Sequence, residues 1–348
     1  MSKLKSKLKT MLSLFCFNFR VSKLPYMPKV AIVELTNECN YRCKFCPMNS
    51  ENETIRRKVT REKTYMSFED FKDIVDKYGH LIDNLGLASH GESLLHPEFE
   101  KFVKYLSEKG IDWNITTNGS LLDEKMAEIF KKYPPTQIIL SLYSLEPKRY
   151  EKLCINGNLD VVLKNINHFL ENRDKKTKIV IRTINMPQLQ GEIQKFKSYF
   201  DKYENVEYLF GVLNTWAGRV DISKYDSNLK NHKISHENNY CLQPWQHVII
   251  NSDTGVYLCN NDDDTPMGYL NKTNLGEIWN SKEYIQVRKN ILNGKLTDNN
   301  QCKECDTYIP TAKCEAPSPF FLVNRSFLRR VATFIGLKKN HDWTTDKK

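Results

Sequence analysis

The chain lacks a long apolar run, because nowhere do its 348 residues approach eighteen consecutive apolar positions, roughly the minimum length of a transmembrane helix. We therefore expect no membrane-spanning segment. The N-terminus also lacks the pattern of a cleavable signal peptide. Ten cysteines in such a chain point to a reducing cytoplasm, where disulfides are rare, and to metal ligation as the use of the thiols.

Acidic residues are scarce at both ends of the chain. The first 28 residues contain six basic residues and no acid, giving +6, and residues 317–348 contribute +5. Because the whole chain carries +10, the body between these ends carries −1. A nucleic-acid enzyme is expected to carry its basic surface around the active site, so the nearly neutral body argues against a nucleic-acid partner.

The most informative segment of the chain follows an apolar strand, and no histidine lies within about thirty residues of it. This segment holds Cys39, Cys43 and Cys46, with spacings of three and then two residues. Zinc sites usually pair two Cys-x2-Cys knuckles or include histidine, so structural zinc is the less favoured alternative. A 4Fe-4S cluster has four irons, and three thiolates leave one iron open for a substrate or cofactor.

The Cys-x3-Cys-x2-Cys spacing, with Phe45 just before the last cysteine, resembles the cluster-binding signature of the radical SAM superfamily. The resemblance implies that S-adenosylmethionine (SAM) chelates the open iron and is reductively cleaved to a 5'-deoxyadenosyl radical. It further implies a reductant such as flavodoxin or ferredoxin, and it makes Phe45 a cofactor-binding candidate.

Residues 29–213 alternate apolar runs with helical periodicity, which predicts strand-helix units around a parallel sheet. Ser67 and Asn158 are expected to cap helices. Six strands and five helices match the partial (β/α)6, TIM-like barrel of radical SAM enzymes, so we expect an α/β fold with a small C-terminal iron-sulfur domain. The predicted strands are 30–35, 84–89, 112–117, 136–143, 178–184 and 206–212, and the predicted helices are 67–78, 96–109, 122–133, 158–173 and 188–201.

Polar residues follow the later predicted strands. Gly91 and Glu92 resemble the Gly-Gly-Glu-Pro motif of the family, which holds the SAM amino group, although His90 stands where the motif has its first glycine. The physical basis is a close backbone approach and a charge-assisted hydrogen bond. By the same resemblance Asn118 and Ser141 contact the methionine carboxylate and the ribose of SAM. Ordinary turn chemistry would also explain such residues.

Four further cysteines in the C-terminal third have the spacing Cys-x17-Cys-x42-Cys-x2-Cys. They resemble the SPASM and twitch domains that carry auxiliary clusters, and four thiolates complete one 4Fe-4S cluster without an open iron. A zinc ribbon is the alternative. Two auxiliary clusters would need about eight thiolates, and Cys314 is the only other cysteine here, so we expect one cluster. The predicted ligands are Cys241, Cys259, Cys302 and Cys305.

These motifs divide the chain into an N-terminal extension (1–28), a barrel (29–213), a linker (214–240), an auxiliary cluster domain (241–316) and a C-terminal tail (317–348). Both ends are predicted to form basic amphipathic helices, which either pack on the barrel or contact a membrane surface. We expect a cytoplasmic protein, with a peripheral position at the inner membrane face left open. In the N-terminal helix the shared apolar face comprises Leu4, Leu8, Met11, Leu12, Phe15 and Phe19.

The motifs together imply an enzyme that takes a hydrogen atom from an unactivated carbon. The auxiliary spacing is closest to the twitch arrangement of aminocyclitol dehydrogenases, so oxidation of a sugar or cyclitol alcohol is the first hypothesis. Epimerisation of a sugar, with Cys154 as a hydrogen-atom donor, is the second, and peptide maturation is the third. A non-enzymatic iron-sulfur carrier or zinc-binding adaptor also remains. Cys154 is the weakest site candidate, because a free cysteine usually acts as a small hydrophobe.

Overall fold

The computed structural model describes residues 3–49, 64–189, 191–225, 241–261, 265–299 and 302–305. Met1–Pro310 forms one compact unit. The second unit, Thr311–Lys348, lies outside the described residues, and with it Cys314 and the predicted tail helix. Among the described helices, none combines the length and the apolar character needed to cross a membrane.

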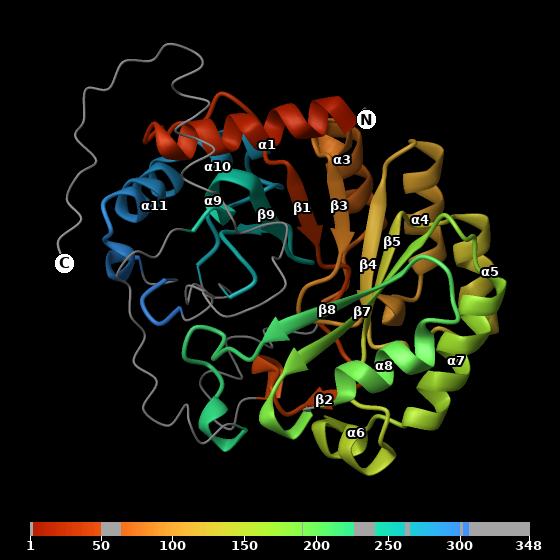
Figure 1. Cartoon of the computed structure of the whole chain (residues 1–348). Helices are drawn as coiled ribbons and strands as arrows, with labels where there is room; N and C mark the ends of the chain where they lie inside the picture. The colour runs from red at the N-terminus through yellow and green to blue at the C-terminus, as the bar shows by residue number, and fades with distance from the viewer. Residues whose placement is uncertain are drawn as a thin grey trace. The chain divides into compact units, whose positions relative to one another are not determined.

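The centre of the fold is a run of six parallel strands, which confirms the predicted α/β architecture (Figure 1). Neighbouring strands in this run all pair in parallel. Each strand begins within one residue of its predicted start. In chain order and in sheet order the strands are β1 (Val30–Val33), β3 (Asn84–Leu87), β4 (Trp113–Thr117), β5 (Gln137–Ser141), β7 (Lys178–Asn185) and β8 (Val206–Val212).

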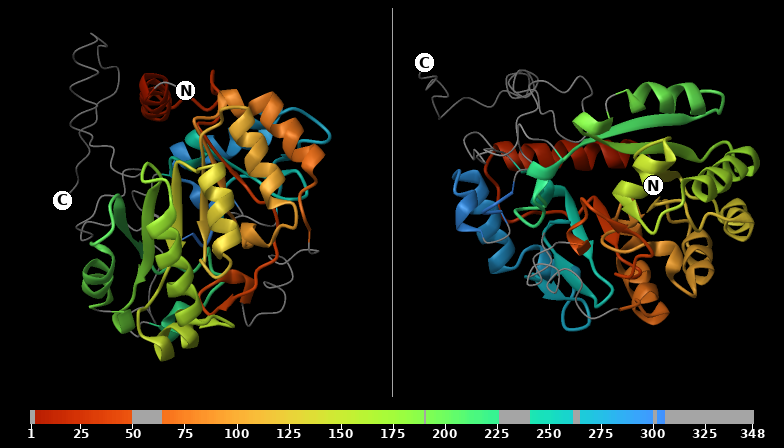
Figure 2. Two further views of the ribbon diagram at one scale, coloured as in Figure 1. Left: turned by 90° about the vertical axis from the view of Figure 1, so that its right-hand side faces the viewer. Right: turned by 90° about the horizontal axis from the view of Figure 1, so that it is seen from below.

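Five amphipathic helices connect these strands and lie along the outside of the curved sheet (Figure 2). The predicted caps are confirmed, because the Ser67 side chain accepts from the Asp70 N–H and the Asn158 side chain accepts from the Val161 N–H. Each such cap contributes about 1 kcal/mol. The helices are α3 (Phe68–Tyr78), α4 (Phe99–Glu108), α5 (Glu124–Lys132), α7 (Leu159–Asn172) and α8 (Glu192–Phe200).

Three strands that the sequence did not predict extend the sheet beyond β1. β9 (His247–Ile250) pairs with β1 in parallel, β10 (Gly255–Tyr257) pairs antiparallel with β9, and β11 (Gly268–Tyr269) pairs antiparallel with β10. The complete order is β11-β10-β9-β1-β3-β4-β5-β7-β8. The segment that carries the second cysteine set therefore continues the sheet of the barrel.

Shorter elements complete the described part of the chain. α1 (Lys3–Asn18) crosses the edge at which the strands begin (Figure 1). β2 (Arg42–Cys43) pairs antiparallel with β6 (Cys154–Ile155), directly after α6 (Pro147–Leu153). The C-terminal segment adds α9 (Gln243–Gln246), α10 (Leu275–Trp279) and α11 (Lys282–Leu292).

Candidate active site

The first cysteine loop leaves the carboxyl end of β1, where parallel α/β folds place their chemistry. Pairing of β2 with β6 holds Cys43, the middle cysteine of the loop. The Cys46 N–H donates to the Cys43 carbonyl (3.1 Å), and the Arg42 guanidinium donates to the Cys39 carbonyl (2.8 Å). These bonds turn the loop back on itself and leave all three cysteines half-buried.

The donor set fits a 4Fe-4S cluster. Burial, followed by the charge of Glu92, raises the pKa of Cys39 to about 12. A hydrogen bond with Cys154 and burial likewise raise the pKa of Cys43. Such thiols ionise when iron supplies positive charge. Among the described residues, no group of three or more His, Cys, Asp or Glu side chains is placed to hold a single metal ion. A 4Fe-4S cluster does not need such a group, because each thiolate binds a different iron.

Gly91 brings the predicted SAM motif against the cysteine loop. A Cβ on Gly91 would lie 2.1 Å from the carbonyl oxygen of Thr36 and 2.6 Å from that of Glu38. Real Cβ atoms do not approach backbone oxygens so closely, so only glycine fits. The Glu92 N–H donates to the Glu38 carbonyl (2.8 Å) and completes the contact. Backbone packing alone thus requires this glycine.

Glu92 is buried, with an exposed fraction of 3%. One carboxylate oxygen accepts from the Asn118 N–H (2.8 Å) and the other from the Leu94 N–H (3.2 Å). Burial raises the pKa of Glu92 to about 7, although these hydrogen bonds act in the opposite direction. A cationic ammonium group beside the carboxylate would favour its ionised form. The structure adds a second role, since the same carboxylate holds the end of β4.

Asn118 links the end of β4 to the cysteine loop through a closed set of side-chain hydrogen bonds. Its Nδ2 donates to Asn40 Oδ1 (2.9 Å), and its Oδ1 accepts from Ser120 Oγ (2.6 Å). Asn40 Nδ2 in turn donates to Ser120 Oγ (2.8 Å). Asn40 directly follows Cys39, so the structure brings Asn118 to the cysteine loop.

The remaining predicted residues are Phe45, Ser141 and Cys154. The Phe45 ring packs edge-on against Tyr143, with the ring centroids 4.5 Å apart. Ser141 is the last residue of β5, two positions before Tyr143. Cys154 is buried opposite Cys43 in the β2–β6 pair. Hydrogen-atom donation by Cys154 and contact of Ser141 with SAM stay predictions.

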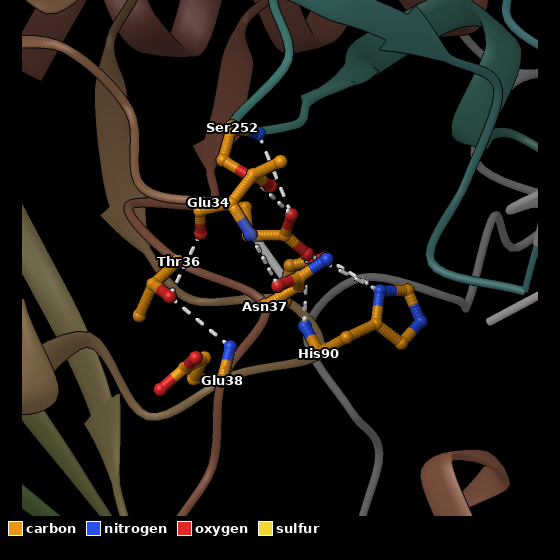
Figure 3. Close-up of polar contacts among 8 residues, drawn as sticks. Glu34, Thr36, Asn37, Glu38, His90 and Ser252 are labelled. Atoms are coloured by element: carbon orange, nitrogen blue, oxygen red, sulfur yellow. Dashed lines mark hydrogen bonds and ion pairs between the residues drawn. The ribbon is translucent and has the colours of Figure 1, made fainter. Parts of the chain in front are cut away.

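Sequence reasoning missed Glu34, a buried acid directly after β1 (Figure 3). Its Oε1 accepts from Ser252 Oγ (3.0 Å). Its Oε2 accepts from the His90 N–H (3.4 Å) and lies 3.5 Å from His90 Nδ1. Glu34 therefore joins β1, the turn before Gly91 and the β9–β10 loop. The signal in the sequence was an acidic residue at the end of an apolar run. A buried charge needs polar partners, so this position could have been predicted to lie in a polar contact.

A turn after β8 has an unusual backbone. Trp216, Ala217 and Gly218 have φ values of 52°, 55° and 81°, in the left-handed region that costs each non-glycine residue about 1–2 kcal/mol. Local side chains support the turn. Asn214 Oδ1 accepts from the Trp216 N–H (2.9 Å), and Thr215 Oγ1 accepts from the Gly218 N–H (2.9 Å).

This turn contacts both cysteine groups. Trp216 Nε1 donates to the carbonyl of Phe45, next to Cys46 (3.0 Å). A Cβ on Gly218 would lie 2.1 Å from a carboxylate oxygen of Glu304, within the Cys302–Cys305 turn. The strained backbone is thus held between the two segments that carry the predicted ligands.

The second cysteine set belongs to the C-terminal segment, whose strands β9 to β11 extend the sheet. Cys241 precedes α9, and Cys259 follows β10. Cys302 and Cys305 share a tight turn in which the Cys305 N–H donates to the Cys302 carbonyl (3.2 Å). Cys259 is half-buried, the other three are buried, and no described cysteine forms a disulfide. Four largely buried thiols suit a fully ligated 4Fe-4S cluster.

Comparison with known sequences identifies both parts of the chain. The sequence model of the radical SAM superfamily matches residues 33–196, and that of SPASM, an iron-sulfur cluster-binding domain, matches residues 241–306. GTP 3',8-cyclase of Aquifex aeolicus is 29% identical over 205 residues, which cover 56% of this chain and 62% of that protein. GTP 3',8-cyclase of Alkaliphilus oremlandii is 34% identical over 138 residues, covering 39% and 41%. The chain thus spans less than two thirds of these curated relatives.

Two solved structures share the fold of the chain. BtrN in complex with AdoMet and 2-DOIA has a TM-score of 0.53 at 18% identity, covering 80% of this chain and 93% of BtrN. Streptococcus suis SuiB bound to precursor peptide SuiA has a TM-score of 0.61 at 15% identity, covering 85% and 73%. The likeness at these identities shows the fold.

The family matches confirm the predicted cofactors, namely a SAM-binding 4Fe-4S cluster, an auxiliary 4Fe-4S cluster and SAM. Which cysteines ligate each cluster stays a prediction from their spacing and placement. Residues 33–196 form a radical SAM domain, and residues 241–306 form a SPASM-type iron-sulfur domain that follows it.

Proposed function

We propose that the protein oxidises an alcohol carbon of a sugar or cyclitol to a carbonyl by radical SAM chemistry. The observation that carries the proposal is that a three-cysteine loop follows the first strand of the sheet and a four-cysteine set belongs to the segment that extends the same sheet. When bound, the cluster that Cys39, Cys43 and Cys46 would hold would supply the electron that cleaves SAM. The cluster that Cys241, Cys259, Cys302 and Cys305 would hold would accept the electron released when the alcohol carbon gives up its hydrogen atom and the hydroxyl group loses its proton to solvent.

The residues of the chain prepare this chemistry by positioning. Gly91 allows the SAM motif to approach the cysteine loop, and Glu92 offers a carboxylate to the SAM amino group. Asn118 ties the end of β4 to the same loop. Phe45, directly before Cys46, packs its ring against that of Tyr143, so both rings would help to keep water from a radical formed beside the loop.

The comparisons leave room for other substrates. The fold resembles BtrN, whose structure holds 2-DOIA, and also SuiB, whose structure holds a peptide. Five cysteines after residue 240 suffice for one auxiliary cluster, and this count favours the dehydrogenase over a peptide maturase with two auxiliary clusters. Sugar epimerisation is the second candidate, because Cys154 lies beside the cysteine loop. A flavodoxin- or ferredoxin-type protein is the proposed reductant.

Iron counting tests the cluster assignment. We expect about eight irons in the anaerobically reconstituted protein. Joint replacement of Cys39, Cys43 and Cys46 by alanine should remove about four irons and all SAM cleavage, while replacement of Cys302 and Cys305 should disturb only the second cluster. Stoichiometric zinc without iron after anaerobic purification would contradict the whole proposal.

Isotope transfer tests the reaction. The reconstituted protein, SAM and reductant are incubated with aminocyclitols and sugars deuterated at carbinol carbons, with a precursor peptide, and with GTP as a separate arm. Oxidation predicts deuterium in 5'-deoxyadenosine and one carbonyl product for each SAM consumed. Epimerisation predicts that solvent hydrogen enters the product, and this uptake should be lost in Cys154→Ala. Turnover of the peptide or of GTP alone would refute the alcohol substrate.

A further inference from the structure

The outer face of α1 is a stripe of exposed apolar side chains. Leu8 and Met11 are each 55% exposed, and Phe19 is 45% exposed. Leu12 and Phe15 complete the stripe, and the rings of Phe15 and Phe19 stack with centroids 4.2 Å apart. Of the nine exposed large hydrophobic side chains in the described part of the chain, four belong to α1 and a fifth, Phe19, directly follows its last residue. Contiguous apolar surface of this kind marks an interaction site.

The exposure does not arise from a loosely attached helix. Lys9 forms an ion pair with Asp83 (3.0 Å) and also donates to a backbone carbonyl before β3. Ser13 Oγ accepts from Gln246 Nε2 (2.8 Å), and both residues are buried. The inner face of α1 is thus bound to the body while the apolar stripe faces outward.

The contacts also fix where the stripe lies. Asp83 precedes β3, Gln246 precedes β9, and Lys29, which donates to Thr10 Oγ1 (2.6 Å), precedes β1. The helix therefore covers the edge where the strands begin, opposite the cysteine loop at their carboxyl ends (Figure 1). A surface bound by α1 would leave the candidate active site accessible.

The charge around the stripe distinguishes among the partners that could bind it. The first 28 residues carry six basic residues and no acid, and Lys7, Arg20 and Lys23 are exposed. The C-terminal segment 317–348 carries +5, so its charge has the same sign as that of α1. A second copy packed stripe to stripe would also bring two acid-free segments together. An anionic lipid surface supplies apolar depth and the opposite charge.

We propose that α1 docks the protein on an anionic lipid bilayer, with the stripe of Leu8, Met11, Leu12, Phe15 and Phe19 in the interface and the basic residues at the headgroups. Each basic residue near the surface strengthens binding about fivefold, and the attraction weakens as salt rises. The protein would lie on the bilayer, with its active-site edge directed away from the lipid.

Cosedimentation of the full chain with vesicles tests the proposal. We expect binding to vesicles of phosphatidylglycerol and phosphatidylcholine at low salt, with weaker binding at high salt or to phosphatidylcholine alone. Joint replacement of Leu8, Met11 and Phe15 by serine should reduce binding at least about tenfold, since it removes the apolar contact. The matched control replaces Val161 and Leu209, which are 47% and 36% exposed elsewhere on the body, and should bind normally.

Charge reversal provides an independent variant, because Lys7→Glu with Lys23→Glu leaves the stripe intact. It should weaken binding to anionic vesicles by more than tenfold without changing the melting temperature. Three results would overturn the proposal. In the first, the stripe variant binds vesicles as well as the parent does. In the second, the protein binds vesicles only after residues 311–348 are removed. In the third, the parent associates with itself and the stripe variant does not. The second would assign the stripe to the tail of the chain, and the third to another copy.

Discussion

Replacing Glu92 by glutamine separates two effects of its carboxylate, one on the stability of the fold and one on SAM binding. The side chain is fully enclosed, and burial raises its pKa to about 7 from the ordinary 4.5. A carboxyl group with a raised folded-state pKa contributes fully to stability below about pH 4.5, and this contribution is lost as the pH rises through about 7. The two pKa values correspond to about 3 kcal/mol between acidic and alkaline conditions.

At pH 8 glutamine removes the cost of burying a charged carboxylate, but its side chain offers only one acceptor oxygen to the N–H groups of Asn118 and Leu94. One of them then loses its partner, at about 1 kcal/mol. We therefore expect cluster-free Glu92→Gln to be about 2 kcal/mol more stable than the parent at pH 8, with no gain at pH 4. The reconstituted variant should bind SAM about 10- to 150-fold more weakly, since a charge-assisted hydrogen bond is lost.

Urea unfolding at both pH values measures the first effect, and equilibrium SAM binding to iron-loaded protein measures the second. Glu100→Gln is the matched control, because Glu100 is exposed on α4 and carries the same charge. Unchanged SAM affinity would restrict the Glu92 carboxylate to shaping the end of β4. Lower stability at pH 8 would show that the hydrogen bonds to the charged carboxylate outweigh its burial.

Three further substitutions test the packing of the candidate active site and the titration of His247, the first residue of β9. Gly91→Ala should lose the first cluster, because a methyl group would overlap a backbone carbonyl. Gly211→Ala is the control and should keep all iron, because its methyl group would lie at an ordinary contact distance of 3.5 Å from the Thr183 carbonyl oxygen. Trp216→Phe leaves the Phe45 carbonyl without its donor and should cost about 1 kcal/mol, measured by chemical unfolding with iron content as a second readout. Burial and Lys29 lower the pKa of His247 to about 4. Stability should therefore fall by about 3 kcal/mol as the pH drops from 6.5 to 4, and His247→Gln should flatten this dependence.

The barrel could be predicted because its signals are local. Each strand is followed by a helical period, and caps such as Ser67 and Asn158 mark where the helices begin. The first cysteine loop is also local, since its three thiols fall within eight residues. Spacing alone therefore indicated both the cluster and its position after the first strand.

The parts that could not be predicted depend on distant contacts. β9 is only four residues long, and nothing in its sequence specifies β1 as its partner. Glu34 was visible as an acid near an apolar run, but Ser252 lies more than two hundred residues away. The left-handed backbone of Trp216 and Ala217 opposes their local preferences, so only the surrounding contacts explain it.

Strand register explains how the two cysteine groups are brought together. β9 pairs with β1 residue by residue, from Val30 with His247 to Val33 with Ile250, and the Glu34 N–H continues the pattern by donating to the Ile250 carbonyl (2.9 Å). Because the ends of both strands coincide, the Glu34 carboxylate can reach the β9–β10 loop. A slip of one residue would place the side chains of β9 on opposite faces and break this contact. A parallel strand pair therefore places the β9–β10 loop, which precedes Cys259, beside the end of β1, and the strained turn at Trp216 links the first cysteine loop to the Cys302–Cys305 turn.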